Sequence, residues 1–243
     1  MDIKSLRSKW KVSIIIPTKN EEETIDEVLT KIKPYGDEII VIDGHSSDNT
    51  KKIVKKHRIK FFLDNGKGKG AAVRLGLEIA SNPIVVFIDA DGSHEPKDIP
   101  KLIKPIREDI ADLVIGSRMT GGSDELFSDF YEFIRLTGSM IINLAINYRW
   151  NVRLSDTQNG FRAIVRDVGR YIKLTANSTT IEQEMVMKCL NYGYRVINVP
   201  SHEYKRKGGE SKILVSKVWL AYVWNMMRFV FFSPSKKKFF KKF

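Results

Sequence analysis

The feature that most constrains the fold is an alternation of short apolar strands with amphipathic helices through the first half of the chain. The strands are rich in Ile and Val and are apolar at nearly every position. Such strands are typical of parallel sheets with both faces covered. The sequence therefore predicts a doubly wound α/β domain. The expected strands are 12–16, 38–42, 60–63, 84–88 and 112–116, and the expected helices are 22–32, a segment capped by Ser46 or Ser47, and 71–80. Beyond about residue 123 the pattern is less regular, with long helical stretches and fewer strands.

Charge is the second constraint, because the 243-residue chain carries a formal net charge of +12. A basic excess of this size points to an anionic partner, which can be nucleic acid, an anionic lipid surface or a phosphate-bearing substrate. Five lysines and three phenylalanines, with no acid, make up residues 236–243. Much of the excess charge therefore lies in one short segment that also carries apolar rings.

Carboxylates follow two of the predicted strands, at the edge where open α/β sheets bind ligands. Asp43 follows strand 38–42, and Asp89 and Asp91 follow strand 84–88 with one residue between them. Two carboxylates at this spacing can converge on a hard divalent cation, while a substrate diphosphate supplies further oxygens. The position after a buried strand and before Gly92 makes this D-x-D more specific than an isolated triplet. We therefore expect Asp89 and Asp91 to hold Mg²⁺ or Mn²⁺.

The glycine-rich segment GKGKGA (66–71) offers an alternative interpretation. It follows a strand and opens a helix, and acids lie about 20 residues further on, as in a dinucleotide-binding fingerprint. Two observations count against a nicotinamide or flavin enzyme: the segment follows the third strand rather than the first, and the acids come as a pair. Lys67 and Lys69 instead suit a loop that faces phosphate.

Six short motifs occur in an order that resembles a known family: PTKNEEETI (17–25), DGHSSDNT (43–50), DADGSHEP (89–96), GSR (116–118), SDTQNGFRA (155–163) and RKGGESK (206–212). Together they resemble the dolichyl-phosphate hexosyltransferases of inverting glycosyltransferase family 2, the dolichol-phosphate mannose synthases among them. The resemblance covers about residues 11–212. It implies a GT-A fold, a Rossmann-like sheet at whose strand ends a nucleotide sugar and a divalent metal meet. It also implies transfer of a hexose, mannose or glucose, from GDP-mannose or UDP-glucose to a dolichyl or other polyprenyl phosphate.

The resemblance also assigns residues to sites. Asp89 and Asp91 would hold the metal, and Ser93 stands where the family often has Gln. Ser211 would belong, with Arg206 and Lys212, to a loop that closes over the site. The donor would be bound by Pro17, Thr18, Asn20, Glu21, Asp43, Lys69, Ala90, Asp91, Arg206 and Lys212. The acceptor phosphate would meet Arg118, Arg135 and Ser139, and the catalytic group would be Asp91, Arg118 and Asp156.

The reaction explains why such a site lacks a prominent histidine. A polyprenyl phosphate is anionic at neutral pH and can attack the anomeric carbon without a general base. His45 and His94 are therefore expected in turn or solvated roles. The alternative, a family 2 enzyme acting on a glycan or other hydroxyl, needs a base, for which Asp156 or Glu184 would serve. Nucleic acid is not expected as a partner, because acids at a phosphate-contacting face repel it.

The C-terminal part suggests contact with a membrane. Residues 213–232 can form a helix with one narrow polar stripe (Lys217, Ala221, Asn225 and Arg228) and otherwise apolar faces. We expect a GT-A domain over 1–212 and, over 213–243, an interface helix with a basic tail on anionic lipid, although 20 residues also permit a span. The aromatic-rich stretch 126–150 is a second candidate for lipid contact.

Two further features concern the compartment. The first residues have no apolar core, so no signal peptide is expected. The single cysteine, Cys189, excludes an internal disulfide and is expected to be a buried, inert thiol in a helix over 181–193. Together they predict a protein on the cytoplasmic face of the membrane, peripheral or anchored by its C-terminal helix.

Overall fold

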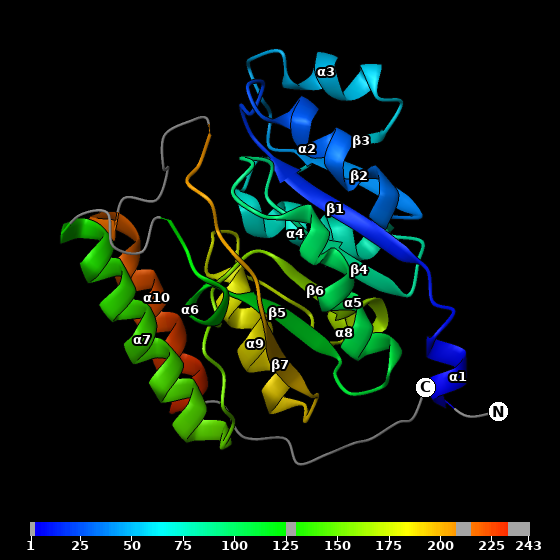
Figure 1. Cartoon of the computed structure of the whole chain (residues 1–243). Coiled ribbons are helices and arrows are strands. Elements are labelled where there is room, and N and C mark those ends of the chain that lie inside the picture. Colours follow the sequence, from blue (N-terminus) through cyan, green and yellow to red (C-terminus); the bar gives the residue numbers. More distant parts are fainter. Residues whose placement is uncertain (1–2, 125–129, 208–214, 233–243) are drawn as a thin grey trace.

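The computed structural model describes residues 3–124, 130–207 and 215–232. Its centre is a seven-stranded sheet in the order β3-β2-β1-β4-β6-β5-β7 (Figure 1). Neighbouring strands are parallel except at β6, which is antiparallel to both β4 and β5. The strands are β1 (Val12–Thr18), β2 (Glu38–Asp43), β3 (Lys60–Leu63), β4 (Ile84–Phe87), β5 (Leu113–Ser117), β6 (Arg162–Val165) and β7 (Val196–Pro200). The predicted mostly parallel α/β sheet is confirmed.

Helices cover both faces of this sheet (Figure 1). Helix α4 packs on β1 and β2, α5 packs on β4, β5 and β6, and α9 packs on α4 and β7. The helices described are α1 (Ile3–Arg7), α2 (Ile25–Ile32), α3 (Thr50–Lys56), α4 (Lys69–Ile79), α5 (Ile99–Arg107), α6 (Arg118–Gly121), α7 (Phe130–Trp150), α8 (Arg166–Tyr171), α9 (Ile181–Asn191) and α10 (Val215–Val230), with 3₁₀ turns at Lys33–Tyr35 and Pro96–Asp98.

The register of the central strands brings their carboxyl ends together. Thr18 at the end of β1 lies opposite Asp43 at the end of β2, and Ile15 lies opposite Phe87 of β4. The residues of β1, β2 and β4 are mostly buried because helices cover both faces of the sheet there. Polar groups that follow these strands are therefore held at one edge by a rigid core.

The start of α3 differs from the prediction. We expected Ser46 or Ser47 to cap this helix, but it begins at Thr50. Asp48 accepts a hydrogen bond from the Thr50 amide (3.0 Å), whereas Ser46 donates its amide to the Asp43 carboxylate (2.8 Å). The carboxylate two residues before the helix satisfies an orphan amide at its start, which leaves the serines to shape the loop.

The far edge of the sheet, opposite the strand-end loops, depends on Glu38. Its side chain is mostly buried and accepts hydrogen bonds from the Lys60 ammonium (2.6 Å), the Ser13 hydroxyl and the Ser81 amide and hydroxyl (both 2.9 Å). Burial alone would raise the pKa of Glu38, but these partners outweigh it and lower the pKa from 4.5 to about 2. The ionised carboxylate therefore stabilises the folded state.

Replacing this residue, Glu38→Gln, is expected to lower the free energy of unfolding at pH 7 by about 1–2 kcal/mol, since hydrogen bonds to a charged group are lost. Because the folded pKa lies below the unfolded one, the wild-type advantage is complete above pH 4.5 and disappears as the pH falls toward 2. Urea unfolding at several pH values measures it. Glu108→Gln, which removes a surface pair 4.0 Å from Lys104, is the control. A pH-independent difference would contradict this account.

Helices α7 and α10 lie side by side against α9 (Figure 1). Arg149 Nε of α7 donates to the carbonyl of Val230 at the end of α10 (2.9 Å). Both helices also expose large apolar side chains, among them Trp224 (69% exposed) and Leu144 (70%). The exposed apolar residues are Met140, Ile141, Leu144 and Tyr148 on α7, and Leu220, Val223, Trp224 and Met227 on α10, followed by Phe231 and Phe232. We call these ten residues the apolar helix-pair face.

The predicted polar stripe of α10 is divided between two environments. Ala221 and Arg228 are exposed, whereas Asn225 points to α9 and donates to the Thr180 carbonyl (3.4 Å) and to the Gln183 side chain (3.2 Å). No helix among the described residues is both long enough and apolar enough to cross a bilayer. The boundary predicted at 212/213 lies outside the described residues.

Candidate active site

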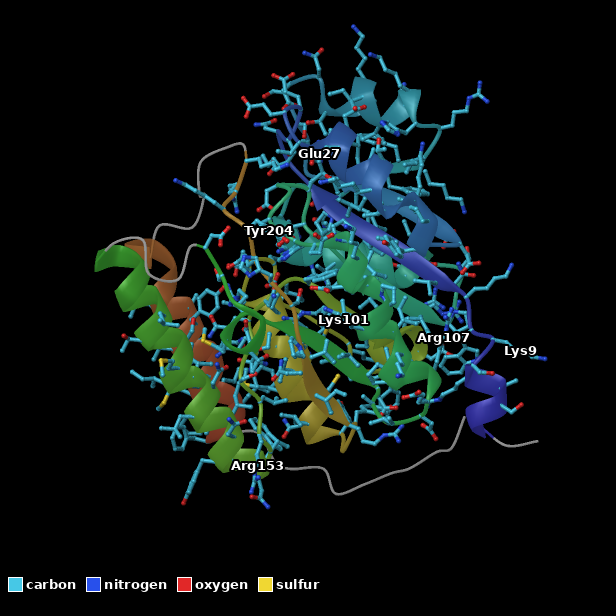
Figure 2. All side chains as sticks on the ribbon, viewed as in Figure 1. Lys9, Glu27, Lys101, Arg107, Arg153 and Tyr204 are labelled. Carbon is cyan, nitrogen blue, oxygen red and sulfur yellow. The ribbon has the colours of Figure 1, made fainter. Side chains whose placement is uncertain are left out.

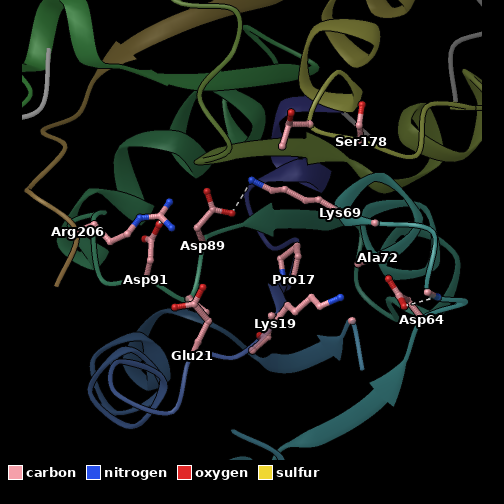
Figure 3. A pocket seen from close by; sticks show the side chains of 16 residues that line it. Pro17, Lys19, Glu21, Asp64, Lys69, Ala72, Asp89, Asp91, Ser178 and Arg206 are labelled. Atoms are coloured by element: carbon pink, nitrogen blue, oxygen red, sulfur yellow. Dashed lines mark hydrogen bonds and ion pairs between the residues drawn. The ribbon is translucent and has the colours of Figure 1, made fainter. Parts of the chain in front are cut away.

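A cavity of about 420 Å³ opens at the carboxyl edge of β1, β2 and β4 (Figure 3). Eight of the residues predicted for the donor and the metal line it: Pro17, Thr18, Glu21, Lys69, Asp89, Ala90, Asp91 and Arg206. Eight others were not predicted: Lys19, Gly44, Asp64, Gly66, Gly68, Ala72, Ser178 and Thr179. The sequence thus located the cavity and about half of its wall.

The two aspartates of the D-x-D motif both face this cavity, and each forms an ion pair with a different basic side chain (Figure 3). Asp89 Oδ1 lies 2.7 Å from Lys69 Nζ, and Asp91 Oδ2 lies 2.8 Å from a guanidinium nitrogen of Arg206. Burial would raise the pKa of Asp89, but the ammonium of Lys69 and the nearby His94 hold it well below its usual range. Asp89 is therefore ionised, and each of the two carboxylates can exchange its basic partner for a metal cation.

These carboxylates fit a divalent cation that is shared with a bound diphosphate. Oδ1 of Asp91 is fixed by the Ser93 amide (3.1 Å) and hydroxyl (2.7 Å), and Gly92 between them has φ +73°. Ser93 thus orients Asp91. No cluster of three or more His, Cys, Asp or Glu side chains suited to a metal occurs in the part of the chain that the structure describes. Two protein carboxylates suffice where a substrate supplies oxygens.

The glycines of segment 66–71 are explained by close backbone packing and do not require a dinucleotide-binding fingerprint. Gly68 has φ +106°, and a Cβ there would come within 2.7 Å of the Asn177 carbonyl oxygen. Gly70 donates its amide to the same carbonyl (2.9 Å) and has no room for a Cβ. The glycines let the start of α4 contact the loop before α9, and this contact places Lys69 beside Asp89.

A second charged cluster lies on the loop between α7 and β6. Asp156 accepts two hydrogen bonds from the Arg118 guanidinium (2.7 and 3.2 Å), and Glu203 lies 3.6 Å from the third guanidinium nitrogen. Amides of Gln158 (3.0 Å) and Asn159 (3.2 Å) also donate to Asp156. Burial would raise the pKa of Asp156, but Arg118 and the amides lower it. Asp156 therefore orients Arg118 and is poorly suited to take up a proton.

The predicted acceptor group is brought together only in part. Ser139 on α7 donates to the Gln158 side chain (3.2 Å), in the same loop as Asp156, so Ser139 and Arg118 share a neighbourhood. The side chain of Arg135 lies outside the described ones, as do Ser211 and Lys212. Neither Arg118 nor Ser139 lines the 420 Å³ cavity.

Two predicted donor residues shape the loops instead of lining the cavity. Asp43 turns to Ser46, and the side chain of Asn20 accepts the Ser47 amide (2.8 Å). Asn20 also has φ +55°, a conformation in which Asn is favoured. Asn20 holds the loop after β1 against the loop after β2, in which Asp43 fixes Ser46. The direct contact of Asp43 with a nucleobase stays a prediction.

Glu184, His45 and Cys189, the other residues considered from the sequence, have contacts that indicate structural roles. Glu184 accepts the amides of Thr175 (3.0 Å) and Ala176 (2.7 Å) and pairs with Lys188 (2.7 Å), which fixes the loop before α9. His45 contacts the Asp64 carbonyl (3.0 Å), a turn role as expected. Burial raises the pKa of Cys189, which confirms an inert thiol.

His94 contradicts the expectation of a turn or solvated role. It is buried, stacks on Phe161 with ring centroids 5.1 Å apart, and places Nε2 3.5 Å from Asp89. The side chain is enclosed because the segment after β7 covers its loop, with an isolated bridge between His94 and Glu203.

That segment, residues 201–207, runs back over the D-x-D loop. Tyr204 donates its amide to the Ser93 carbonyl (2.8 Å), and the Lys207 ammonium pairs with Glu27 of α2 (2.8 Å). Figure 2 labels Tyr204 and Glu27 at this edge of the molecule. The covering segment carries Arg206 to Asp91, as expected for a loop that closes over the site.

The fold and the site define an α/β domain with two carboxylates, each paired with a basic side chain, in a pocket at the strand ends. This arrangement suits a nucleoside diphosphate and a divalent metal cation. The chain belongs to glycosyl transferase family 2, whose family profile matches residues 13–171. It is a glycosyltransferase with a GT-A-like fold.

Relatives with assigned names support this membership. The chain is 32% identical over 200 residues to glycosyltransferase AglJ of Haloferax volcanii, covering 82% of this chain and 64% of AglJ. It is 31% identical over 230 residues to a dolichol-phosphate mannosyltransferase of Pyrococcus furiosus, covering 90% and 64%. An undecaprenyl-phosphate mannosyltransferase of Micrococcus luteus is 31% identical over 220 residues, covering 84% and 87%. The chain thus spans about 64% of the length of the first two relatives.

Among solved structures, glucosyl-3-phosphoglycerate synthase of Mycobacterium tuberculosis, in complex with Mn²⁺, UDP and its product, has a TM-score of 0.72 at 20% identity. The match covers 96% of this chain and 84% of that one. At this identity the similarity establishes the fold.

Proposed function

We propose that this glycosyltransferase catalyses metal-dependent, inverting transfer of a hexose from a nucleotide sugar to a polyprenyl phosphate at a membrane. The observation that most supports a phosphate acceptor over a hydroxyl acceptor is the pairing of Asp156 with Arg118. A hydroxyl acceptor needs a base, and both candidate carboxylates are engaged: Asp156 by Arg118, and Glu184 by Lys188 and backbone amides. A phosphate acceptor needs none. Two relatives named as polyprenyl-phosphate mannosyltransferases support the same class.

The residues of this chain would bind the donor through charge. Lys69 and Arg206 lie beside the strand-end carboxylates, where each can turn to a phosphate oxygen. Asp89 and Asp91 would hold Mg²⁺ or Mn²⁺, which neutralises charge on the departing nucleoside diphosphate. Mn²⁺ or Mg²⁺ with UDP in structural neighbours supports this part of the proposal. The acceptor phosphate oxygen bonds to the anomeric carbon as the bond to the diphosphate breaks, so the configuration inverts.

The test is direct. The protein is incubated with labelled GDP-mannose or UDP-glucose, Mg²⁺ or Mn²⁺, and either a polyprenyl phosphate or a panel of sugars and phosphoglycerate. Label is expected in the lipid phase with one of the two donors. Transfer only to the water-soluble hydroxyl acceptors would overturn the acceptor class and leave the glycosyltransferase assignment intact.

Membrane attachment is the second part of the proposal, at the cytoplasmic face. The apolar helix-pair face would enter the headgroup region, and the basic tail would meet anionic lipid. The apolar surface is supplied by two paired helices, α10 from the segment predicted over 213–232 and α7 from the second candidate stretch, 126–150.

The double variant Leu144→Asp/Trp224→Asp is expected to lower binding to anionic vesicles about tenfold or more, because two exposed apolar side chains contribute about 1.5–3 kcal/mol each when buried. Vesicle sedimentation measures binding. Ile110→Asp, at an exposed apolar residue between α5 and β5, is the matched control. Undiminished binding by the double variant would exclude this face as the attachment surface.

A further inference from the structure

Glu182 is a buried carboxylate beside the site with no role in the function described so far. It is the second residue of α9 and is 5% exposed. Oε1 lies 3.0 Å from the ammonium of Lys69. Oε2 is buried and has no hydrogen-bond partner within the described ranges. A buried charged oxygen without a partner is costly, so its retention calls for a reason.

Lys69 lies between two carboxylates in a confined space. Its ammonium contacts Asp89 (2.7 Å) on the cavity side and Glu182 (3.0 Å) on the protein side. A Cβ on Gly160 would come within 2.7 Å of Asp89 Oδ2 and 2.9 Å of Lys69 Nζ, so the backbone there closes the space. The ammonium therefore has one carboxylate partner more than a single ion pair supplies.

Glu182, the second partner of Lys69, becomes important when Asp89 exchanges Lys69 for a metal cation. If Asp89 turns to a divalent cation, it can no longer serve as the full counter-ion of Lys69. A buried charge that loses its partner is strongly destabilising. Glu182 removes this difficulty because it already neutralises the ammonium, whether Lys69 stays in place or turns to a phosphate oxygen of the donor.

We propose that Glu182 is a positioning residue: it is the standing counter-ion of Lys69 and so lets Asp89 be released to the cation that accompanies the donor diphosphate. The proposal rests on the proposed metal-dependent function. It predicts that Glu182 acts on the cation only through Lys69, without touching the cation itself.

The experiment measures Mn²⁺ binding to the full chain, by electron paramagnetic resonance of free Mn²⁺ in the presence of GDP or UDP. Glu182→Gln removes the charge with little change of shape. It is expected to weaken Mn²⁺ binding about 10- to 100-fold, the usual effect of losing a residue that supports metal ligands. Glu182→Asp should recover part of the loss. Glu78→Gln, an exposed acid on the same helix as Lys69, is the control for net charge.

A double variant separates positioning from simple structural support. In a Lys69→Met background, Glu182→Gln should change Mn²⁺ affinity less than about threefold, since the ammonium that it serves is gone. Equal losses in both backgrounds, or unchanged Mn²⁺ affinity in a folded Glu182→Gln variant, would overturn the proposal while the metal-dependent function stands. If the wild-type protein binds no Mn²⁺ with either nucleotide, the metal-dependent function and this inference both fall.

Discussion

Asp91→Asn is expected to lower the rate of sugar transfer about 100-fold or more while the protein remains folded, because a charge that serves the transition state is removed. The amide oxygen can still accept the hydrogen bonds of Ser93, so the turn at Gly92 is kept. Arg206 loses its carboxylate partner, and the proposed metal cation would lose one of its two proposed protein ligands. Rates with saturating donor and lipid acceptor, with thermal unfolding beside them, measure the effect.

Removal of the metal provides the companion measurement. Excess chelator should stop transfer by the wild-type protein, and Mg²⁺ or Mn²⁺ should restore it. Asp167→Asn, at an exposed acid on α8 that pairs with Arg166, is the control and should keep full activity. Full wild-type activity in chelator would refute the metal role of Asp89 and Asp91.

Asp156→Asn is expected to cost about 3–5 kcal/mol of folding free energy, because it leaves the largely enclosed guanidinium of Arg118 without its bidentate partner. Glu203, at 3.6 Å, compensates only in part. The folded pKa of Asp156 lies below its ordinary 3.8, so the loss is complete above about pH 4 and shrinks as the pH falls below it. Denaturant unfolding at pH 7 and at pH 3 measures both statements.

A surface aspartate gives the comparison for this variant. Asp124→Asn removes an exposed pair with His202 (3.0 Å) and should change stability by less than about 1 kcal/mol. In the Asp156→Asn protein that remains folded, use of the lipid acceptor should fall more than donor binding. A stability loss no larger than that of Asp124→Asn would show that Arg118 does not depend on Asp156.

The sequence predicted the first five strands because each contains a run of at least three apolar residues. Strands β1, β2, β4 and β5 are mostly buried, whereas β3 is largely exposed. The two strands that were not predicted individually, β6 and β7, carry polar residues in their short spans. Arg162 begins β6 and is 1% exposed, with its guanidinium bonded to backbone carbonyls of the 157–159 loop and of Glu182. Asn198 lies within β7 and binds the Asp156 carbonyl (2.8 Å). A polar residue in a four- or five-residue strand hides the apolar pattern of that strand.

The residues of the candidate site also fall into those with a local sequence signal and those without one. Asp89 and Asp91 could be predicted because a carboxylate directly after a buried strand has few structural reasons to be there. The same signal applies to Asp64, which follows the predicted strand 60–63 and lines the cavity but was not selected from the sequence. Glu182, Ser178 and Thr179 carry no local signal. They reach the cavity through the packing of α9 on α4, and such long-range contacts leave no periodic pattern in the sequence.

Helix α10 packs on the start of α9, and this packing affects how a water-soluble form of the enzyme should be designed. Tyr222 donates its hydroxyl to Thr179 (2.9 Å), which lines the cavity, and Asn225 binds Gln183, which is fully buried. Cutting the chain before α10 would uncover Gln183 and release the cavity wall at Thr179. Exchanging outward residues such as Leu220 and Trp224 for polar ones leaves those contacts in place. Surface redesign of this helix is therefore the better route to crystals or assays without detergent than deletion.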